Sequence, residues 1–176
     1  TWPRMRPGLA PMHRINAIAA IGEKTRALGK DNNLIWDIPA DLERFRDLTR
    51  GHPVIMGRKT WESIPAERRP LPKRANIIVT SNPTYNAPGA IIVPSVEAAI
   101  ATAKQAEGAD EIFLIGGHGI FKEGMQHTDR LVLTLVKDDT PGDVTFPAYD
   151  EFTKVVEEEE HLEHAPPFTY VTLERP

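Results

Sequence analysis

The run INAIAAI at residues 15–21 decides the class of fold, because it is apolar almost without interruption. A strand with one solvated face alternates apolar and polar residues, whereas a strand buried on both faces is apolar along its length. The run is therefore predicted to be a central strand of a sheet that carries helices on both faces.

The rest of the chain alternates short β-rich runs with helical stretches. Seven further strands are predicted, at residues 53–56, 76–80, 90–93, 111–115, 130–136, 152–158 and 168–173. Helices are predicted at residues 39–49, from residue 58, after the capping residue Ser95 and after Gly117. The pattern predicts a single α/β domain: a mixed, mainly parallel sheet of about eight strands with flanking helices and a C-terminal antiparallel hairpin.

Length and composition limit the class of protein. The chain has 176 residues, which fits one domain, and no apolar run approaches the roughly 20 residues of a membrane span. It contains no cysteine, which removes disulfides, thiol catalysis and cysteine-ligated metal and suits a reducing cytoplasm. Residues 1–11 hold three prolines and little periodic pattern. They are expected to be an extension without function, so that the domain covers residues 12–176.

Charge is unevenly distributed along the chain. The formal net charge is −4, yet residues 58–74 hold six cations against two glutamates. Focused positive charge attracts anions even on an acidic protein, whereas a nucleic-acid surface is normally larger and interleaved with aromatic residues. The acidic stretch at residues 150–163 is predicted to be a solvated edge strand and loop.

One carboxylate, Asp41, lies in the first turn of the helix predicted at residues 39–49. An acidic residue at this position often only offsets the helix dipole, and on the residues alone that interpretation stays open. Asp41 nevertheless adjoins the apolar face formed by Leu42, Phe45 and Leu48, where an unpaired carboxylate is costly. It therefore needs a partner, such as a basic heterocycle.

Three loop segments are candidates for ligand binding. GRKT at residues 57–60 and GGHG at residues 116–119 each follow a predicted strand and open a helix. Either can be a plain turn, but free backbone N–H groups at a helix start bind phosphate. The polar segment at residues 22–37 is predicted to lack regular structure and to be functional, as long irregular loops usually are.

Four segments resemble the bacterial-type dihydrofolate reductase family in order and spacing: WDIPADL (36–42), GRKTWESI (57–64), RPLPKR (69–74) and GGHG (116–119). The resemblance runs over about residues 15–175. It implies reduction of 7,8-dihydrofolate to 5,6,7,8-tetrahydrofolate by NADPH, with hydride transfer to C6 of the pterin and protonation of N5 through water.

The resemblance assigns catalytic roles to four residues. Asp41, assisted by Thr134, is expected to accept paired hydrogen bonds from N3 and the 2-amino group of the pterin. Trp36 is expected to order the proton-delivering water, and Leu34 to close over the nicotinamide.

The resemblance also implies two sets of binding residues. Substrate contacts are expected from Ile18, Ala20, Asp41, Leu42, Phe45, Ile64, Arg69, Leu71, Arg74, Ile115, Phe121 and Thr134. Cofactor contacts are expected from Ala20, Ile21, Gly29, Asn32, Leu34, Gly57, Arg58, Lys59, Thr60, Val79, Thr80, Ser81, Ile115, Gly116, Gly117, His118, Gly119, Ile120 and Phe121.

Within these sets, Arg74 is expected to bind the α-carboxylate of the glutamate tail, for which its planar fork is suited. Arg58, with Thr80 and Ser81, is expected to hold the adenosine 2′-phosphate, which makes NADPH rather than NADH the donor. In the family a cis peptide joins the residues that correspond to Gly116 and Gly117.

The chain departs from the family pattern at three positions. Gly119 stands where many bacterial relatives carry a cation, Phe121 where tyrosine is common, and Ile35 where proline is frequent. Two other functions stay open: a pyrimidine-type reductase of the same architecture, as in riboflavin synthesis, and a non-catalytic folate- or RNA-binding relative. The expected protein is a cytoplasmic monomer that binds antifolates such as methotrexate and trimethoprim and needs no metal, nucleic acid or membrane.

Overall fold

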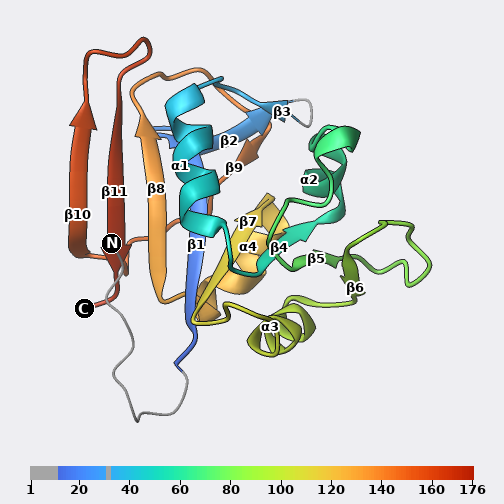
Figure 1. Ribbon diagram of the computed structural model, residues 1–176. Helices are drawn as coiled ribbons and strands as arrows, with labels where there is room; N and C mark the ends of the chain where they lie inside the picture. Colours follow the sequence, from blue (N-terminus) through green and yellow to red (C-terminus); the bar gives the residue numbers. More distant parts are fainter. Residues whose placement is uncertain (1–11, 31–32) are drawn as a thin grey trace.

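The main sheet of the protein contains eight strands and lies at the centre of the fold (Figure 1). The computed structural model describes residues 12–30 and 33–176. The strands of the main sheet are β1 (Arg14–Gly22), β4 (Val54–Gly57), β5 (Asn76–Val79), β6 (Ile91–Val93), β7 (Glu111–Gly116), β8 (Arg130–Val136), β10 (Lys154–His161) and β11 (Phe168–Glu174). The helices are α1 (Pro39–Thr49), α2 (Arg58–Ser63), α3 (Val96–Lys104) and α4 (His118–Gly124), with 3-10 turns at Ala66–Arg68 and Met125–His127.

The strand order is β10-β11-β8-β1-β7-β4-β5-β6. Neighbouring strands from β8 to β6 in this order are parallel, whereas β11 runs antiparallel to both β8 and β10. The predicted mixed, mainly parallel sheet with a C-terminal hairpin is confirmed. Both bounds of the strand predicted at residues 152–158 were wrong, because β10 runs from Lys154 to His161. It begins late because the segment before it turns through a hydrogen bond from Phe152 N to Tyr149 O and buries the Phe152 ring.

Side chains alternate between two cores on opposite faces of the sheet. Along β7, Ile112 and Leu114 join one cluster, while Phe113 and Ile115 join the other. The first cluster contains residues of α3 and α4, and the second contains residues of α1 and α2. Helices on both faces explain why the β1 run is apolar throughout.

Helices begin where the sequence predicts. Pro39 occupies the first turn of α1, where its missing N–H is not needed. The Ser95 side chain accepts a hydrogen bond from Ala98 N at 3.0 Å and so caps α3. Within the described ranges of the chain, no helix is both long and apolar enough to cross a membrane.

The segment at residues 22–37 was wrongly predicted to lack regular structure. It contributes β2 (Ala27–Lys30) and β3 (Asn33–Leu34), which join β9 (Val144–Thr145) in a second sheet of order β3-β2-β9. The strands are short, and β9 lies more than a hundred residues further along the chain. The local pattern therefore gave no sign of this pairing. Residues 1–11, expected to be an extension, and Asn32 lie outside the described residues.

Candidate active site

A cleft of about 1340 Å³ opens on the face of the sheet covered by α1 and α2. Its walls come from β1, β3, α1, the segment after α2, and the ends of β7 and β8. The structure brings together thirteen residues predicted from the sequence: Ile18, Ala20, Leu34, Trp36, Asp41, Leu42, Phe45, Thr60, Ile64, Leu71, Arg74, Ile115 and Thr134.

Asp41 projects from the first turn of α1 toward β8. The hydroxyl of Thr134, a residue only 2% exposed, donates a hydrogen bond to Asp41 Oδ1. Burial raises the pKa of Asp41, and the Thr134 hydrogen bond and the charge of Arg44 offset only part of this effect. The cleft therefore contains a carboxylate that is held in place by one neighbour and is poorly solvated.

Arg44 stands one helical turn beyond Asp41 and also lines the cleft. Its guanidinium carbon lies 4.1 Å from the centre of the Tyr170 ring on β11, a cation–π contact that fixes the side chain. The held cation favours the ionised form of Asp41.

The outer part of the cleft is apolar on its walls and cationic at one end. Phe45, Ile64 and Leu71 belong to the core cluster on this face and also line the cleft. Arg74 is half-buried beyond them, and burial, followed by the charges of Arg50 and Arg46, lowers its pKa. A ligand with an aromatic centre and an anionic end fits this arrangement.

A buried asparagine holds the loop that carries Leu71 and Arg74. Asn76 Oδ1 accepts a hydrogen bond from Leu71 N at 2.9 Å, and Asn76 Nδ2 donates to Leu71 O and to Arg74 O. The Arg74 guanidinium in turn donates to Thr49 Oγ1 at 2.8 Å and to Pro72 O at 2.9 Å. The position of Arg74 is therefore set by both the loop and the end of α1.

The glycine-containing segments meet beside the cleft because their strands are parallel neighbours. Gly57 pairs with Val79 at the ends of β4 and β5, and Met56 pairs with Gly116 at the end of β7. A Cβ atom on Gly116 would lie 3.5 Å from the hydroxyl of Thr60, so the two segments lie against each other. The peptide between Gly116 and Gly117 is cis, as the family resemblance implied, and Gly116 has φ +123°, a conformation that side chains disfavour.

Arg58 opens α2 and lies at the surface. Its Nη1 donates to both carboxylate oxygens of Glu62, at 2.9 and 3.0 Å, and the Tyr85 hydroxyl donates to the same carboxylate at 3.0 Å. Thr80 and Ser81 directly follow β5, whose end adjoins that of β4. The guanidinium thus stands at the edge of the sheet where the predicted phosphate-binding residues gather.

The small sheet connects the cleft to the GGHG segment. Leu34 in β3 is 65% exposed, lines the cleft and pairs with Gly29 in β2. The next strand, β9, contains Thr145, whose carbonyl oxygen is 2.6 Å from Nδ1 of His118. The sequence gave no sign of this connection, because only the folded chain brings β9 to the start of α4.

Some predicted residues lie away from the cleft wall. Arg69 has its guanidinium 5.4 Å from the ring centre of Trp61. Ile21, Ile120 and Phe121 are buried in the core cluster on the opposite face. The remaining predicted cofactor residues in the described ranges are Gly29, Gly57, Arg58, Lys59, Val79, Thr80, Ser81, Gly116, Gly117, His118 and Gly119, and their roles stay predictions.

The cleft also contains residues that sequence reasoning missed. They are Ala19, Ile35, Asp37, Ile38, Pro39, Glu43, Arg44, Arg46, Arg50, Ser63, Pro65, Glu67, Arg68 and Pro72. Arg46 follows Leu42 by one helical turn, so the helical period could have indicated it. Arg68 stands where Arg69 was expected, because the 3-10 turn at Ala66–Arg68 brings it to the cleft.

The fold and the cleft define a class of protein: a single α/β domain with a cleft at the carboxyl ends of parallel strands, which is where open α/β sheets usually bind ligands. A sequence model of the family described as "Dihydrofolate reductase" matches residues 14–175. The chain belongs to the dihydrofolate reductase family.

Individual relatives agree with the family match. "Dihydrofolate reductase type 3" of Salmonella typhimurium is 42% identical over 135 residues, which cover 77% of this chain and 79% of that protein. "Dihydrofolate reductase HdrB" of Haloferax volcanii is 36% identical over 166 residues, which cover 92% of this chain and 84% of that protein. A solved structure of dihydrofolate reductase from Enterococcus faecalis, complexed with NADP(H) and RAB-propyl, matches with TM-score 0.81 and 32% identity. The match covers 92% of this chain and 96% of that one.

The raised pKa of Asp41 predicts that Asp41→Asn stabilises the fold at neutral pH. A folded-state pKa above the unfolded value means that ionised Asp41 destabilises the folded protein at pH values above the raised pKa. The destabilisation disappears as the pH falls below the ordinary value of 3.8. The melting temperature of the variant should therefore exceed that of the wild type at pH 7, and the difference should shrink in acid.

The matched control is Asp47→Asn, which removes an exposed carboxylate from the same helix. It should change the free energy of unfolding by no more than about 0.5 kcal/mol. A lower melting temperature for Asp41→Asn at pH 7 would show that the buried carboxylate stabilises the fold instead.

Proposed function

We infer that the protein reduces 7,8-dihydrofolate to 5,6,7,8-tetrahydrofolate with NADPH. The observation that carries this function is the carboxylate of Asp41, held by Thr134 and facing the cleft, in a chain of the dihydrofolate reductase family. A basic ring with adjacent N–H donors is the natural partner of a half-buried carboxylate, because two charge-assisted hydrogen bonds offset its desolvation.

We propose that Asp41 orients the pterin and does not take part in covalent chemistry. The Thr134 hydroxyl uses one lone pair of Oδ1, which leaves Oδ2 and the remaining lone pair of Oδ1 for N3 and the 2-amino group. Ile18, Ala20 and Ile115 form the adjoining wall, which limits where the ring can lie. Bound NADPH supplies the hydride, and these residues present C6 to it.

Protonation of N5 is assigned to a water molecule that Trp36 orders and Leu34 shields. Both residues line the cleft, and Leu34 belongs to the small sheet that pairs β3 with β2. A short strand with an exposed leucine can close over a ligand and exclude bulk water.

We propose that the tail of the substrate extends along Phe45, Ile64 and Leu71 to Arg74. The three side chains form an apolar wall for the p-aminobenzoyl ring. Arg74, held by Thr49 and Pro72 and accompanied by Arg46 and Arg50, offers a fixed guanidinium to a carboxylate.

The cofactor is NADPH, which we place along the carboxyl ends of β4, β5 and β7. Gly116 supports this placement, because its positive φ of +123° is a backbone conformation that residues with a side chain rarely adopt. The backbone there can approach a ligand closely, and Arg58 with Thr80 and Ser81 would bind the 2′-phosphate.

Further proposals concern the protein as a whole. We propose that residues 12–176 form the enzyme domain and act as a monomer in the cytoplasm, without nucleic acid; the absence of cysteine suits a reducing compartment. Members of this family bind antifolates, and diaminopyrimidine and diaminopteridine compounds present the donors that complement Asp41. The monomeric state is tested by measuring the mass of the protein in solution, alone and with methotrexate, which should stay near the chain mass of 19.6 kDa.

The activity is tested by following NADPH consumption in the presence of dihydrofolate. The wild type should turn over, and Asp41→Asn should lose most of its turnover at pH 7, by about a hundredfold, because the amide offers one acceptor instead of two. A non-catalytic relative would show no turnover at all. Near wild-type turnover in Asp41→Asn would remove the carboxylate from the mechanism.

Arg58→Ala should raise the Michaelis constant for NADPH about tenfold to a hundredfold and leave that for NADH nearly unchanged. Only NADPH carries the 2′-phosphate, and a lost charge-assisted contact costs about 1.5–3 kcal/mol. Lys59→Ala, which removes the neighbouring cation, should raise the Michaelis constant for NADPH by a smaller factor. Equal weakening of both coenzymes would place Arg58 on the pyrophosphate.

Arg74→Ala should weaken the binding of methotrexate and dihydrofolate about tenfold or more, while a diaminopyrimidine inhibitor without a glutamate tail should keep its affinity. Dissociation constants for both inhibitor types measure the difference. Lys73→Ala, an exposed neighbour outside the cleft wall, should affect neither inhibitor. Comparable losses for both inhibitor types in Arg74→Ala would mean that Arg74 supports the loop instead of binding the tail.

A further inference from the structure

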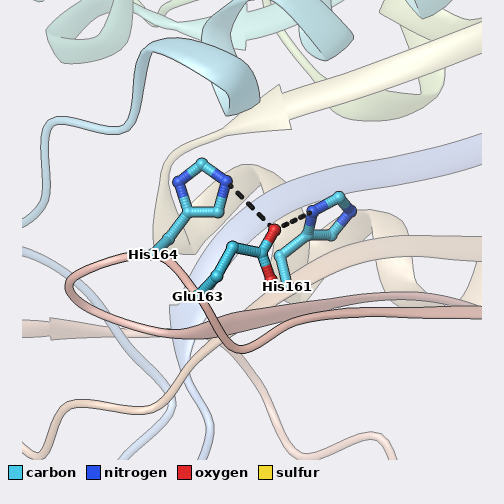
Figure 2. Close-up of side chains that lie close together, drawn as sticks. All are labelled: His161, Glu163 and His164. Atoms are coloured by element: carbon cyan, nitrogen blue, oxygen red, sulfur yellow. Dashed lines mark ion pairs between the residues drawn. The ribbon is translucent and has the colours of Figure 1, made fainter.

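The turn of the C-terminal hairpin brings together two histidines and a glutamate, away from the cleft (Figure 2). His161 ends β10, and Glu163 and His164 follow in the turn that leads to β11. Their ligand atoms all lie within 4.8 Å of one another. Figure 2 shows both imidazole rings directed at the Glu163 carboxylate.

The spacing of these atoms suits ligands of one metal ion better than hydrogen-bond partners. His161 Nδ1 and His164 Nε2 each lie 3.6 Å from the same oxygen, Glu163 Oε1. This distance is too long for a hydrogen bond. Two ligand atoms at about 2.0–2.1 Å from a tetrahedral Zn²⁺ are themselves about 3.4 Å apart, close to the observed spacing.

His161 is oriented for metal binding by a second carboxylate. Its Nε2 lies 2.9 Å from Glu159 Oε1, a hydrogen bond that leaves Nδ1 directed toward Glu163. A carboxylate on the far nitrogen is the usual outer partner of a metal-binding histidine, where it fixes the tautomer and the ring orientation.

The buried ring of Phe168 supports both imidazoles. His161 stacks on it with ring centres 5.0 Å apart and an interplanar angle of 17°, and His164 contacts the same ring at 5.0 Å and 45°. His161 is also the register partner of Phe168 across the hairpin. The rings therefore lose little freedom when they bind an ion.

The charge around the turn favours a cation. Glu157, Glu158 and Glu160 project from the same exposed strand as Glu159. An acidic surface raises the local concentration of cations.

We propose that His161, Glu163 and His164 bind one transition-metal dication, for which Zn²⁺ is the probe. Two imidazoles and one carboxylate are a common donor set for Zn²⁺, whereas Mg²⁺ and Ca²⁺ require oxygen ligands. Three protein ligands leave a fourth position for water. The site does not depend on the proposed enzymatic function. The sequence led us to expect no metal, because the acidic residues 150–163 were predicted to be only a solvated strand and loop. The proposed site differs from that expectation.

The test is a titration of chelator-treated protein with Zn²⁺ against a chromophoric chelator. The wild type should bind one Zn²⁺ per chain, and excess Mg²⁺ should not displace it. His164→Ala and Glu163→Gln should each weaken binding about tenfold or more, as expected when one of three ligands is lost. The matched control is His127→Ala, which removes a histidine that faces a single glutamate, Glu97, at 3.7 Å. It should keep wild-type affinity.

Wild-type affinity in both His164→Ala and Glu163→Gln, or no stoichiometric Zn²⁺ in the wild type, would overturn the proposal. The melting temperature of each metal-free variant, compared with that of the metal-free wild type, checks that the variant has folded. A measurement on the wild type alone gives an independent answer. Substoichiometric Co²⁺ should broaden the NMR signals of residues 159–164 and 168 first, and broadening that begins elsewhere would place the metal at another site.

Discussion

Parallel pairing of β8, β1, β7, β4 and β5 is the constraint on which the rest of the molecule depends. Parallel strands end at one edge of the sheet, so the loops that leave them meet there without any sequence similarity between them. Gly57, Val79 and Gly116 come together in this way. Thr134 sits near the same edge on β8 and faces the α1 side of the sheet. The loops that we propose for the cofactor and the Asp41 carboxylate that we propose for the substrate are therefore adjacent because of the strand topology.

The contact between Thr134 and Asp41 shows how function and stability oppose each other in this fold. Burial raises the pKa of Asp41, and the partners inside the protein offset this only in part. A folded protein selected for stability alone would place a neutral residue in the first turn of α1. A ligand with two N–H donors would supply the missing hydrogen bonds. Binding of such a ligand would therefore offset the desolvation cost of the Asp41 carboxylate, and a ligand without these donors would not. We therefore propose that the stability lost at Asp41 is linked to the specificity of the cleft.

Much of this arrangement could be predicted from the sequence, because apolar runs and helix starts are local signals. The eight strands of the main sheet and the bounds of α1 followed from such runs. Asp41 became a candidate through its place beside an apolar helical face, and the family resemblance was needed to give it a role. The small sheet could not be predicted, since β2 and β9 each hold too few residues to show a period. The lining residues Arg46 and Arg50 carried a usable signal, their helical spacing from Leu42, but charged residues on a helix are usually assigned to solvent. His161, Glu163 and His164 were missed for a similar reason, because histidines inside an acidic stretch look like part of an exposed surface.

The C-terminal hairpin supports the active site from the side. Ile38, at the start of α1, packs with Val136, Phe168 and Tyr170 in one small cluster. Tyr170 is the register partner of Thr134, and its ring also holds the guanidinium of Arg44. Burial, and then the charge of Asp41, raise the pKa of Tyr170, so the tyrosine and the carboxylate influence each other across the strand. β11 therefore contacts the surroundings of both Thr134 and Asp41. At the edge of the sheet, β11 is covered by the exposed strand β10. A metal ion at the hairpin turn would tie the end of β10 to the turn before β11 at Phe168, the residue that begins this chain of contacts to Asp41.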